Sequence, residues 1–354
     1  MITIGVDFSK RNSNYQVRDN NGNTIKRCKL KNEPEGIVKF LDALPYPKRL
    51  AMEATRNWGL YYETVKEHVD EFLLGHPRKM KQISESQTKH DRKDADLISQ
   101  MAYSGFFPKA HVSSLDTREM RSILRFRHFL VKQRKSIRNQ VQILLDRNLW
   151  PCQRPGAFKN PFCKRGLEWL KSLSLSDRER HILDDCLENF YSLSHQIANL
   201  EAFVESQTLD HPDLAYLRRV PGFQKSRVNT YVVLFEIEDI RRFPKAKSFA
   251  HYAGLIPSEY SSGDKHCTGR LVKQANHFLR TALIESTHAA VRKDRGLRVY
   301  YQSVKKRAGS GAAVIACARK LGYAVYHVLK NKVDYEPYQP SATTSHPSSI
   351  PSKG

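Results

Sequence analysis

Short apolar runs and amphipathic stretches alternate along the first 110 residues of the chain. Runs typical of strands cover five segments, which are residues 2–7, 15–18, 24–30, 49–53 and 72–74. Helical periodicity covers residues 35–44, 58–69 and 91–103. Three strands in succession, followed by alternating helices and strands, predict a mixed α/β domain with one mixed sheet over residues 1–110.

The pattern becomes helical between residues 111 and 210. Four apolar side chains recur every seven residues in its first half, and these are Ile123, Leu130, Ile137 and Leu144. This spacing is typical of a coiled-coil or bundle seam over residues 120–145. A stretch rich in proline and glycine, residues 150–166, precedes a second helical pattern over residues 176–209. The segment is therefore predicted to be a helical coiled-coil arm, an antiparallel hairpin that is also a candidate dimer contact.

Two further segments complete the chain. Residues 211–335 show helical patterns broken by glycine and proline, and they predict a third, mostly helical domain. Residues 336–354 are rich in Ser, Thr and Pro, which predicts a disordered tail. The predicted fold class is thus α/β plus all-α.

Charge narrows the class of partner. The 354 residues carry 59 Lys and Arg against 36 Asp and Glu, a net charge of +23, and residues 211–335 hold +14 of it. This excess favours a polyanion, meaning nucleic acid or an anionic membrane surface. Because no window approaches 18 consecutive apolar residues, we expect no membrane-spanning helix.

The N-terminus and the cysteines indicate the compartment. Asp7 and Lys10 interrupt what would be the core of a signal peptide, so we do not expect secretion. The six cysteines lie far apart without a CxxC pair, which suggests neither a disulfide scaffold nor a zinc finger. Both observations fit a cytoplasmic protein.

Four carboxylates stand at positions that favour metal chemistry. Asp7 and Glu53 each end an apolar strand, and Asp91 and Asp94 lie three residues apart on one predicted helix. Carboxylate oxygens are the ligands that Mg²⁺ prefers, and two such ions stabilise the attacking and leaving oxygens of phosphoryl transfer. Mn²⁺ is an alternative ion. The competing interpretation is that each acid is an ordinary strand-end, cap or surface carboxylate, as we expect for Asp96.

Three blocks of sequence surround these acids, and they are GVDFSK, AMEAT and KHDRKDADLI. Four more follow in the C-terminal half, in the order LRRVPGFQKS, DIRRFPKAKSFAHYAGLIPSEYSSG, NHFLRTAL and AVIACARKLGYAVY. Together these blocks resemble the DEDD-type transposases of the insertion-sequence-110 family. The resemblance covers nearly the whole chain except the tail, and it depends on the joint order of the blocks.

This resemblance implies a RuvC-like (RNase H-like) N-terminal domain whose acidic tetrad is Asp7, Glu53, Asp91 and Asp94. It also implies a recombinase that acts on donor and target DNA in the cytoplasm of a bacterium or archaeon, associated with the nucleoid, with a guide non-coding RNA as partner. Three positions depart from the family pattern, and these are Arg56, Gln224 and Ala275. None of them removes a tetrad acid, but each bears on local loop geometry or on nucleic-acid contacts.

A serine-containing segment follows in the C-terminal domain. Residues 257–263 are predicted to form a turn-rich loop, and from composition alone Ser-Ser-Gly is an ordinary turn. The resemblance instead implies a serine nucleophile that forms a covalent phosphoserine with DNA. The motif does not separate Ser261 from Ser262, although the family pattern favours Ser261. Four cations follow and are candidate DNA contacts, namely Lys265, Arg270, Lys273 and Arg280.

Two more features are candidate nucleic-acid surfaces. One is a basic stripe on the first long helix, made by Arg118, Arg121, Arg125, Lys132, Lys135 and Arg138. Such a stripe can follow phosphates, or it can be a solvated helix face. The other is residues 217–222, which resemble a helix-hairpin-helix that would hold phosphate through backbone N–H groups.

The sequence leaves three functions open. The first is an Mg²⁺-dependent DNA transposase that uses the tetrad and the serine, is guided by RNA and works as a homodimer or tetramer. The second is a RuvC-like hydrolytic nuclease on branched DNA, which needs the tetrad but not the serine. The third is a non-catalytic nucleic-acid-binding protein, which needs only the basic surface.

Overall fold

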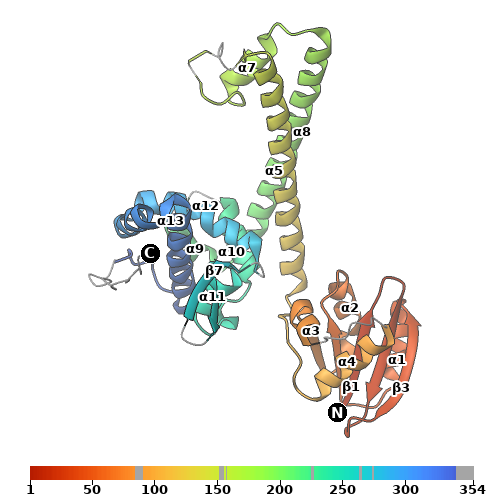
Figure 1. The fold of residues 1–354 in the computed structure, drawn as a ribbon. Helices are drawn as coiled ribbons and strands as arrows, with labels where there is room; N and C mark the ends of the chain where they lie inside the picture. Colours follow the sequence, from red (N-terminus) through yellow and green to blue (C-terminus); the bar gives the residue numbers. More distant parts are fainter. Residues whose placement is uncertain are drawn as a thin grey trace, which may run out of the picture. The chain divides into compact units, whose positions relative to one another are not determined.

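The computed structural model describes two compact units of the chain, Met1–Leu115 (unit 1) and Asp116–Gly354 (unit 2) (Figure 1). The described residues are 1–83, 91–150, 155–156, 158–224, 227–262, 265–272 and 275–339. Only the backbone is described for residues 82–83, 91–93, 227, 258–262 and 265–270.

Unit 1 contains a five-stranded mixed sheet in the order β3-β2-β1-β4-β5. The strands are β1 (Ile2–Phe8), β2 (Asn12–Arg18), β3 (Thr24–Lys31), β4 (Lys48–Glu53) and β5 (Glu71–Gly75). The first three form an antiparallel meander, and β4 and β5 run parallel to β1. Every residue from Ile2 to Val6 is buried, as expected of a central strand covered on both faces. The predicted mixed α/β domain is confirmed.

The helices of unit 1 cover the two faces of the sheet. They are α1 (Pro34–Asp42), α2 (Trp58–Val65), the 3₁₀ turn η1 (Lys66–His68), α3 (Pro77–Ile83) and α4 (Asp91–Tyr103). Ile4, Leu50 and Met52 pack in one core with side chains of α1 and α2. Ala51 packs in a second core with Ile98 and Met101 of α4. Alternate residues of β4 therefore face α1 and α2 on one side and α4 on the other.

Helix α4 approaches β1 closely because β1 has a glycine at the contact. A Cβ atom added to Gly5 would lie 2.3 Å from the carbonyl oxygen of Ala95 and 2.7 Å from Cβ of Ser99. The other end of α4 lies near the start of β4, since the Arg49 guanidinium donates to the carbonyl of Ala102 at 3.2 Å. Helix α4 thus runs antiparallel to β1 and β4, with its N-terminus toward their carboxyl ends.

Unit 2 begins with an antiparallel helix pair, α5 (Leu115–Arg147) and α8 (Asp177–Thr208), which lie side by side in Figure 1. Arg127 pairs with Glu201 at 2.5 Å, and further along Arg134 donates to Ser194 at 3.3 Å. Apolar side chains of both helices meet Leu170 of the short α7 (Lys164–Ser172) in one core. The predicted boundary at residue 210 falls between α8 and the next helix.

The rest of unit 2 is mostly helical. Its elements are α9 (Leu214–Arg219), α10 (Arg227–Ile237), η2 (Ile240–Arg242), α11 (Ala246–Tyr252), β6 (Pro257–Ser262), β7 (Lys265–Leu271), α12 (His277–Lys293) and α13 (Arg295–Asn331). The fully buried Phe249, Leu283 and Leu321 belong to its core. The prediction of a loop was wrong for residues 257–262, which form strand β6 of an antiparallel hairpin with β7, and Gly263 lies outside the described residues. The proline and three serines of β6 are typical turn residues, and they concealed the strand in the sequence.

Helix α13 is the one described helix that is long and apolar enough, by length and composition alone, to cross a membrane. Half of its most apolar 18-residue stretch is buried inside the protein. Leu321 and Val325 pack in the core of unit 2, which accounts for the apolar face without a membrane. The helix also contains Gly309 with φ of 84° and ψ of 169°, where two helical segments meet at a kink.

Candidate functional site

The strand-end acids of unit 1 occupy neighbouring positions on one face of the sheet. Val6 of β1 pairs with Met52 of β4, so Asp7 and Glu53 are the next positions on two adjacent parallel strands. Side chains alternate along a strand, and Gly5 and Ala51 face α4. Asp7 and Glu53 therefore lie on the α4 face, at the carboxyl ends of their strands.

The helical acids approach the same end of the sheet. Asp94 directly precedes Ala95, whose carbonyl contacts Gly5, and Asp91 lies three residues nearer the N-terminus of α4. We call the positions of Asp7, Glu53, Asp91 and Asp94 the acid edge. The side chains of Asp7, Glu53 and Asp94 are partly exposed. Asp7 and Glu53 also make polar or electrostatic contacts inside the protein.

The acid edge has the donor chemistry of a magnesium site, since carboxylate oxygens are its only predicted ligands. Among the described side chains, no three His, Cys, Asp or Glu form a group that could hold a metal ion. The side chain of Asp91 lies outside the described part. The fold thus brings the four positions to one end of the sheet, but it does not assemble a closed metal cage from the described acids.

Asp96 has a different environment, as its position on the helix predicts. Its carboxylate pairs with Arg18 at 2.6 Å, and Arg27 lies 3.8 Å away. The Arg18 side chain is only 14% exposed and also donates to Ser99. Asp96 therefore ties α4 to β2, away from the acid edge.

A cavity of about 420 Å³ opens beside the acid edge. Its lining consists of the residues that follow Asp7 and Glu53 in sequence, and these are Phe8, Ser9, Lys10, Thr55, Arg56 and Asn57. Sequence reasoning treated Arg56 only as a departure and gave Lys10 no role in a site. The signal that could have identified them is their position three residues after two strand-end acids.

The predicted nucleophiles lie at the end of the β6–β7 hairpin. Ser261 pairs with His266 and Ser262 with Lys265 in the backbone register. The side chains of Ser261, Ser262, Lys265 and Arg270 are outside the described part, and so is all of Lys273. The structure therefore gives the register of the serines and leaves their contacts as predictions.

The base of this hairpin is held by backbone and side-chain hydrogen bonds. The Asn276 N–H donates to the carbonyl of Tyr252 at 2.9 Å. Arg280 donates to the carbonyls of Ala253, before β6, and Val272, after β7, at 3.3 and 2.6 Å. Burial lowers the pKa of the Arg280 guanidinium. Arg280, predicted to contact DNA, thus has an internal role in closing the hairpin.

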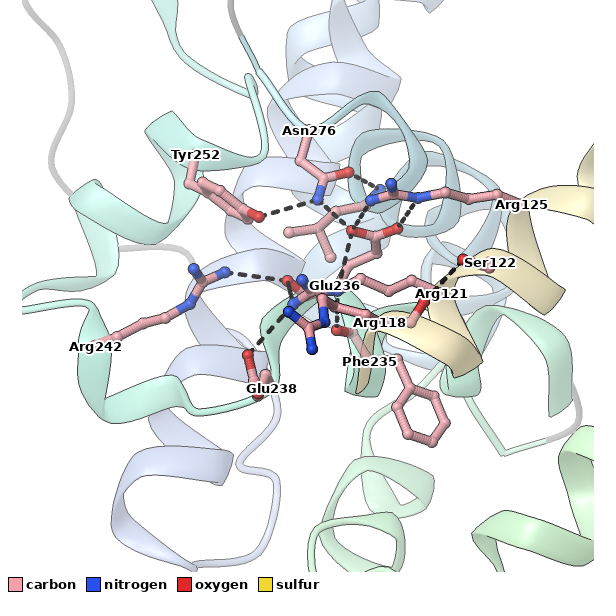
Figure 2. A network of polar contacts seen from close by, with 11 residues as sticks. Arg118, Arg121, Ser122, Arg125, Phe235, Glu236, Glu238, Arg242, Tyr252 and Asn276 are labelled. Carbon is pink, nitrogen blue, oxygen red and sulfur yellow. Dashed lines mark hydrogen bonds and ion pairs between the residues drawn. The ribbon is translucent and has the colours of Figure 1, made fainter. Parts of the chain in front are cut away.

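A buried carboxylate connects this base to the long helix α5 (Figure 2). The Glu236 side chain on α10 is only 3% exposed. Arg125 donates to both of its oxygens at 2.9 Å, and the Asn276 amide donates to it at 2.6 Å. Asn276 is also the N-cap of α12 and contacts the Tyr252 hydroxyl at 3.2 Å. Arg121 completes this group, which we call the Glu236 cluster.

Arg121 lies alongside the same carboxylate. It donates to the carbonyl of Phe235 at 2.7 Å, and its Nε is 3.8 Å from a Glu236 oxygen. Burial lowers the pKa of the Arg121 guanidinium, and the Glu236 carboxylate opposes this shift. Figure 2 shows how the arginines of α5 converge on α10 and on the start of α12.

These contacts divide the predicted basic stripe. Arg121 and Arg125 form ion pairs with the buried Glu236, so the six cations of the predicted stripe are not all free for nucleic acid. Arg138 donates to Asn160 at 3.2 Å and stacks on the Phe162 ring, 5.0 Å from its centre. Lys132 and Lys135 are exposed, and Arg118 is partly exposed. The sequence could not show this division, because Arg125 and Glu236 lie 111 positions apart.

The segment that resembles a helix-hairpin-helix has a buried turn. Val220, Pro221 and Phe223 are buried, and Gly222 has a φ of 96°. A Cβ atom on Gly222 would lie 2.3 Å from the carbonyl oxygen of Ser286 on α12. The glycine is therefore needed both for its backbone conformation and for helix packing. These contacts explain the Pro-Gly pair without a phosphate.

Comparisons with known proteins match both units. A model of the transposase family IS116/IS110/IS902 matches residues 214–302, and a DEDD transposase model of the IS110 type matches residues 4–149. A probable family 20 transposase of Pseudomonas aeruginosa is 24% identical, covering 94% of this chain and 98% of the relative. The transposase for insertion sequence element IS1111A of Coxiella burnetii is 23% identical, over 81% of this chain and 79% of the relative. The transposase for IS1328 of Yersinia enterocolitica is 21% identical, over 86% of each.

Proposed function

Because this chain belongs to the IS110-type DEDD transposases, we propose that it cuts and rejoins DNA through a covalent serine intermediate assisted by Mg²⁺. As an insertion-sequence transposase it acts on DNA. The proposal adds to this the ion, the nucleophile and the course of strand exchange. The main support for the proposal is that the four positions of the acid edge lie together. Two neighbouring strand ends and the N-terminal part of α4 bring them to one face of the sheet.

The sheet topology supports the assignment of unit 1 as RNase H-like. Three antiparallel strands followed by two parallel ones, with helices on both faces, present the end of the central strand beside the end of its parallel neighbour. Functional groups in such sheets collect at the carboxyl ends of strands. Asp7, Glu53, Asp91 and Asp94 are the proposed ligands of two Mg²⁺ ions, with Mn²⁺ as a substitute. When bound, these ions supply Lewis-acid stabilisation of the charge on the attacking and leaving oxygens.

The serine provides the covalent step. The hydroxyl oxygen of Ser261 or Ser262 attacks the phosphorus of a DNA phosphodiester, and the bond from phosphorus to the 3′ oxygen breaks. The proton of the serine is transferred, in net terms, to the departing 3′ oxygen, which leaves a 5′ phosphoserine and a free 3′ hydroxyl. A 3′ hydroxyl of the partner strand then attacks the same phosphorus. The serine leaves and regains its proton, so strands are exchanged without hydrolysis.

The basic surface supports nucleic-acid partners. Lys132 and Lys135 are exposed on α5, and Lys265, Arg270 and Lys273 follow the serines in sequence. We assign the C-terminal cations to the DNA that is cut, and the exposed lysines of α5 to a guide RNA. Since the acids and the serines belong to different units, we further propose that the working site is assembled in a homodimer or tetramer, with the α5–α8 pair as subunit contact.

A covalent trapping assay tests this function. A nicked DNA suicide substrate is incubated with the full-length protein, and products are separated on a denaturing gel. We expect a protein–DNA adduct that requires Mg²⁺ and disappears with Asp7→Asn and with alanine at one of the two serines. Ser258→Ala, which changes the same residue type in strand β6, is the matched control and should keep the adduct.

Two other outcomes identify the competing functions. Cleavage that survives alanine at both Ser261 and Ser262 but not Asp7→Asn would show a hydrolytic nuclease. Tight DNA binding without cleavage, in protein supplied with the RNA that copurifies with it, would show a binding protein. Either result would overturn the serine mechanism.

A further inference from the structure

The cavity beside the acid edge has the chemistry of a phosphate site. Five of the residues that line it have side chains that can bind a phosphate, namely Ser9, Lys10, Thr55, Arg56 and Asn57. Lys10, Arg56 and Asn57 are exposed. Side chains of these types make most protein contacts to DNA phosphates. With a volume of about 420 Å³, the cavity has room for a phosphate and part of its sugar.

A second observation points to a ligand independently of charge. The Thr55 Oγ1 atom is buried and has no hydrogen-bond partner among the residues that the structure describes. Buried hydroxyl groups are nearly always hydrogen-bonded, because leaving one unpaired costs free energy. Thr55 is also one of the residues that line the cavity. Its unpaired hydroxyl can therefore donate to an oxygen that a ligand brings into the cavity.

The position of the cavity identifies the ligand class. Ser9 and Lys10 lie two and three residues after Asp7, and Thr55 and Arg56 lie two and three residues after Glu53. A DNA strand placed at the acid edge brings negative charge toward carboxylates of the same sign. Cations next to the acids lower the cost of that approach and fix the strand through its backbone.

We propose that Lys10, Arg56 and Thr55 bind a backbone phosphate of the DNA strand next to the phosphodiester that is cut. This inference rests on the proposed function in one respect, namely that DNA is the molecule bound at the acid edge. The contact is sequence-independent, because phosphates carry no base information.

Thr55→Val separates binding from folding. Valine keeps the shape of threonine and removes the unpaired hydroxyl, so we expect the melting temperature to stay equal or to rise. DNA affinity should fall by about threefold to tenfold, as expected for one lost hydrogen bond. A structural role for the hydroxyl would instead lower the melting temperature.

Lys10→Gln and Arg56→Gln test the charges. The dissociation constant for a nicked DNA duplex is measured in the full-length protein across a series of salt concentrations. Each variant should bind less tightly and reduce the slope of log affinity against log salt by about one, whatever the DNA sequence. Lys26→Gln is the matched control, because Lys26 lies on β3 over the Phe40 ring, away from the cavity.

The outcomes are distinct from those of the trapping assay. If Lys26→Gln changes the slope as much as Lys10→Gln and Arg56→Gln, or if none does, the phosphate site is refuted. A loss of affinity for RNA with unchanged affinity for DNA refutes it as well. If Asp7→Asn keeps the covalent adduct while the two slopes still fall, the phosphate site stands and the metal function of the acids fails.

Discussion

The acid edge of unit 1 and the Glu236 cluster of unit 2 place carboxylates in opposite surroundings. Glu236 is buried, and Arg125 and Asn276 hold it within the protein. Asp7 and Glu53 are partly exposed at the end of a sheet, beside a cation-lined cavity. A buried and paired carboxylate fixes the packing of the helices around it, whereas carboxylates at an open sheet edge can bind a cation and face a phosphate. The same chemical group thus serves structure in one unit and, as we propose, catalysis in the other.

The largest effect should come from the acid edge. Asp7→Asn and Asp94→Asn keep the shape of the side chain and remove its charge. Adduct formation should fall by more than about 100-fold, because changes even to groups that only orient metal ligands cost 10- to 100-fold. The initial rate of adduct formation and the melting temperature measure activity and folding separately.

Asp96→Asn is the matched control on the same helix. This substitution breaks the ion pair with Arg18 but leaves every proposed metal ligand in place. The initial rate of adduct formation should therefore stay within about threefold of the wild type. Equal losses of activity for Asp94→Asn and Asp96→Asn would break the comparison.

The second effect concerns stability. Glu236→Ala leaves two arginines without their buried partner, which should lower the free energy of unfolding by about 3–5 kcal/mol. Chemical denaturation measures this loss. Glu201→Ala is the comparison, because Glu201 is more exposed than Glu236 and pairs with Arg127. Its loss should lower the free energy of unfolding by at most about 1 kcal/mol. If Glu236→Ala stays as stable as the wild type, the cluster is not a structural clamp.

Asn276→Asp should have an intermediate effect. Aspartate caps a helix as well as asparagine does, so α12 keeps its N-cap. It also places a second carboxylate against Glu236, at a contact that is now 2.6 Å, and like charges should cost about 2 kcal/mol. Chemical denaturation at pH 7 measures the loss, and a variant as stable as the wild type would contradict the prediction.

The smallest effects should come from the exposed lysines of α5. Lys132→Gln and Lys135→Gln should change the free energy of unfolding by less than about 0.5 kcal/mol. Each should lower the salt slope of nucleic-acid binding by about one. Arg125→Gln should instead lower the free energy of unfolding and have little effect on nucleic-acid binding. Fluorescence titration in a salt series distinguishes the two classes of cation on one helix.

Local patterns predicted the framework of unit 1 well. The strands β1 and β4 follow from their short apolar runs, and the bounds of α4 at Asp91 and Tyr103 follow from helical periodicity. Because adjacent parallel strands present their ends together, the neighbourhood of Asp7 and Glu53 could also be expected from their positions. Short-range patterns were sufficient wherever burial and spacing within one element determine the outcome.

Long-range pairings could not be predicted in this way. The Glu236 cluster joins residues of α5, α10 and α12, and no periodicity within one helix distinguishes Arg125, which is paired, from Lys132, which is exposed. The β6–β7 hairpin was missed because β6 begins with Pro257 and ends with Ser261 and Ser262, and such residues are typical of turns. The cavity at Lys10 and Arg56 depends on how two loops meet beyond the sheet.

The central claim is that Asp7, Glu53, Asp91 and Asp94 act together as one metal site. The most direct measurement is a titration of the full-length protein with Mn²⁺, with bound ion counted by electron paramagnetic resonance. We predict one or two bound ions per chain in the wild type and in Asp96→Asn, and loss of binding in Asp7→Asn and Asp91→Asn. Equal binding in all four proteins, or no binding in the wild type, would contradict the account.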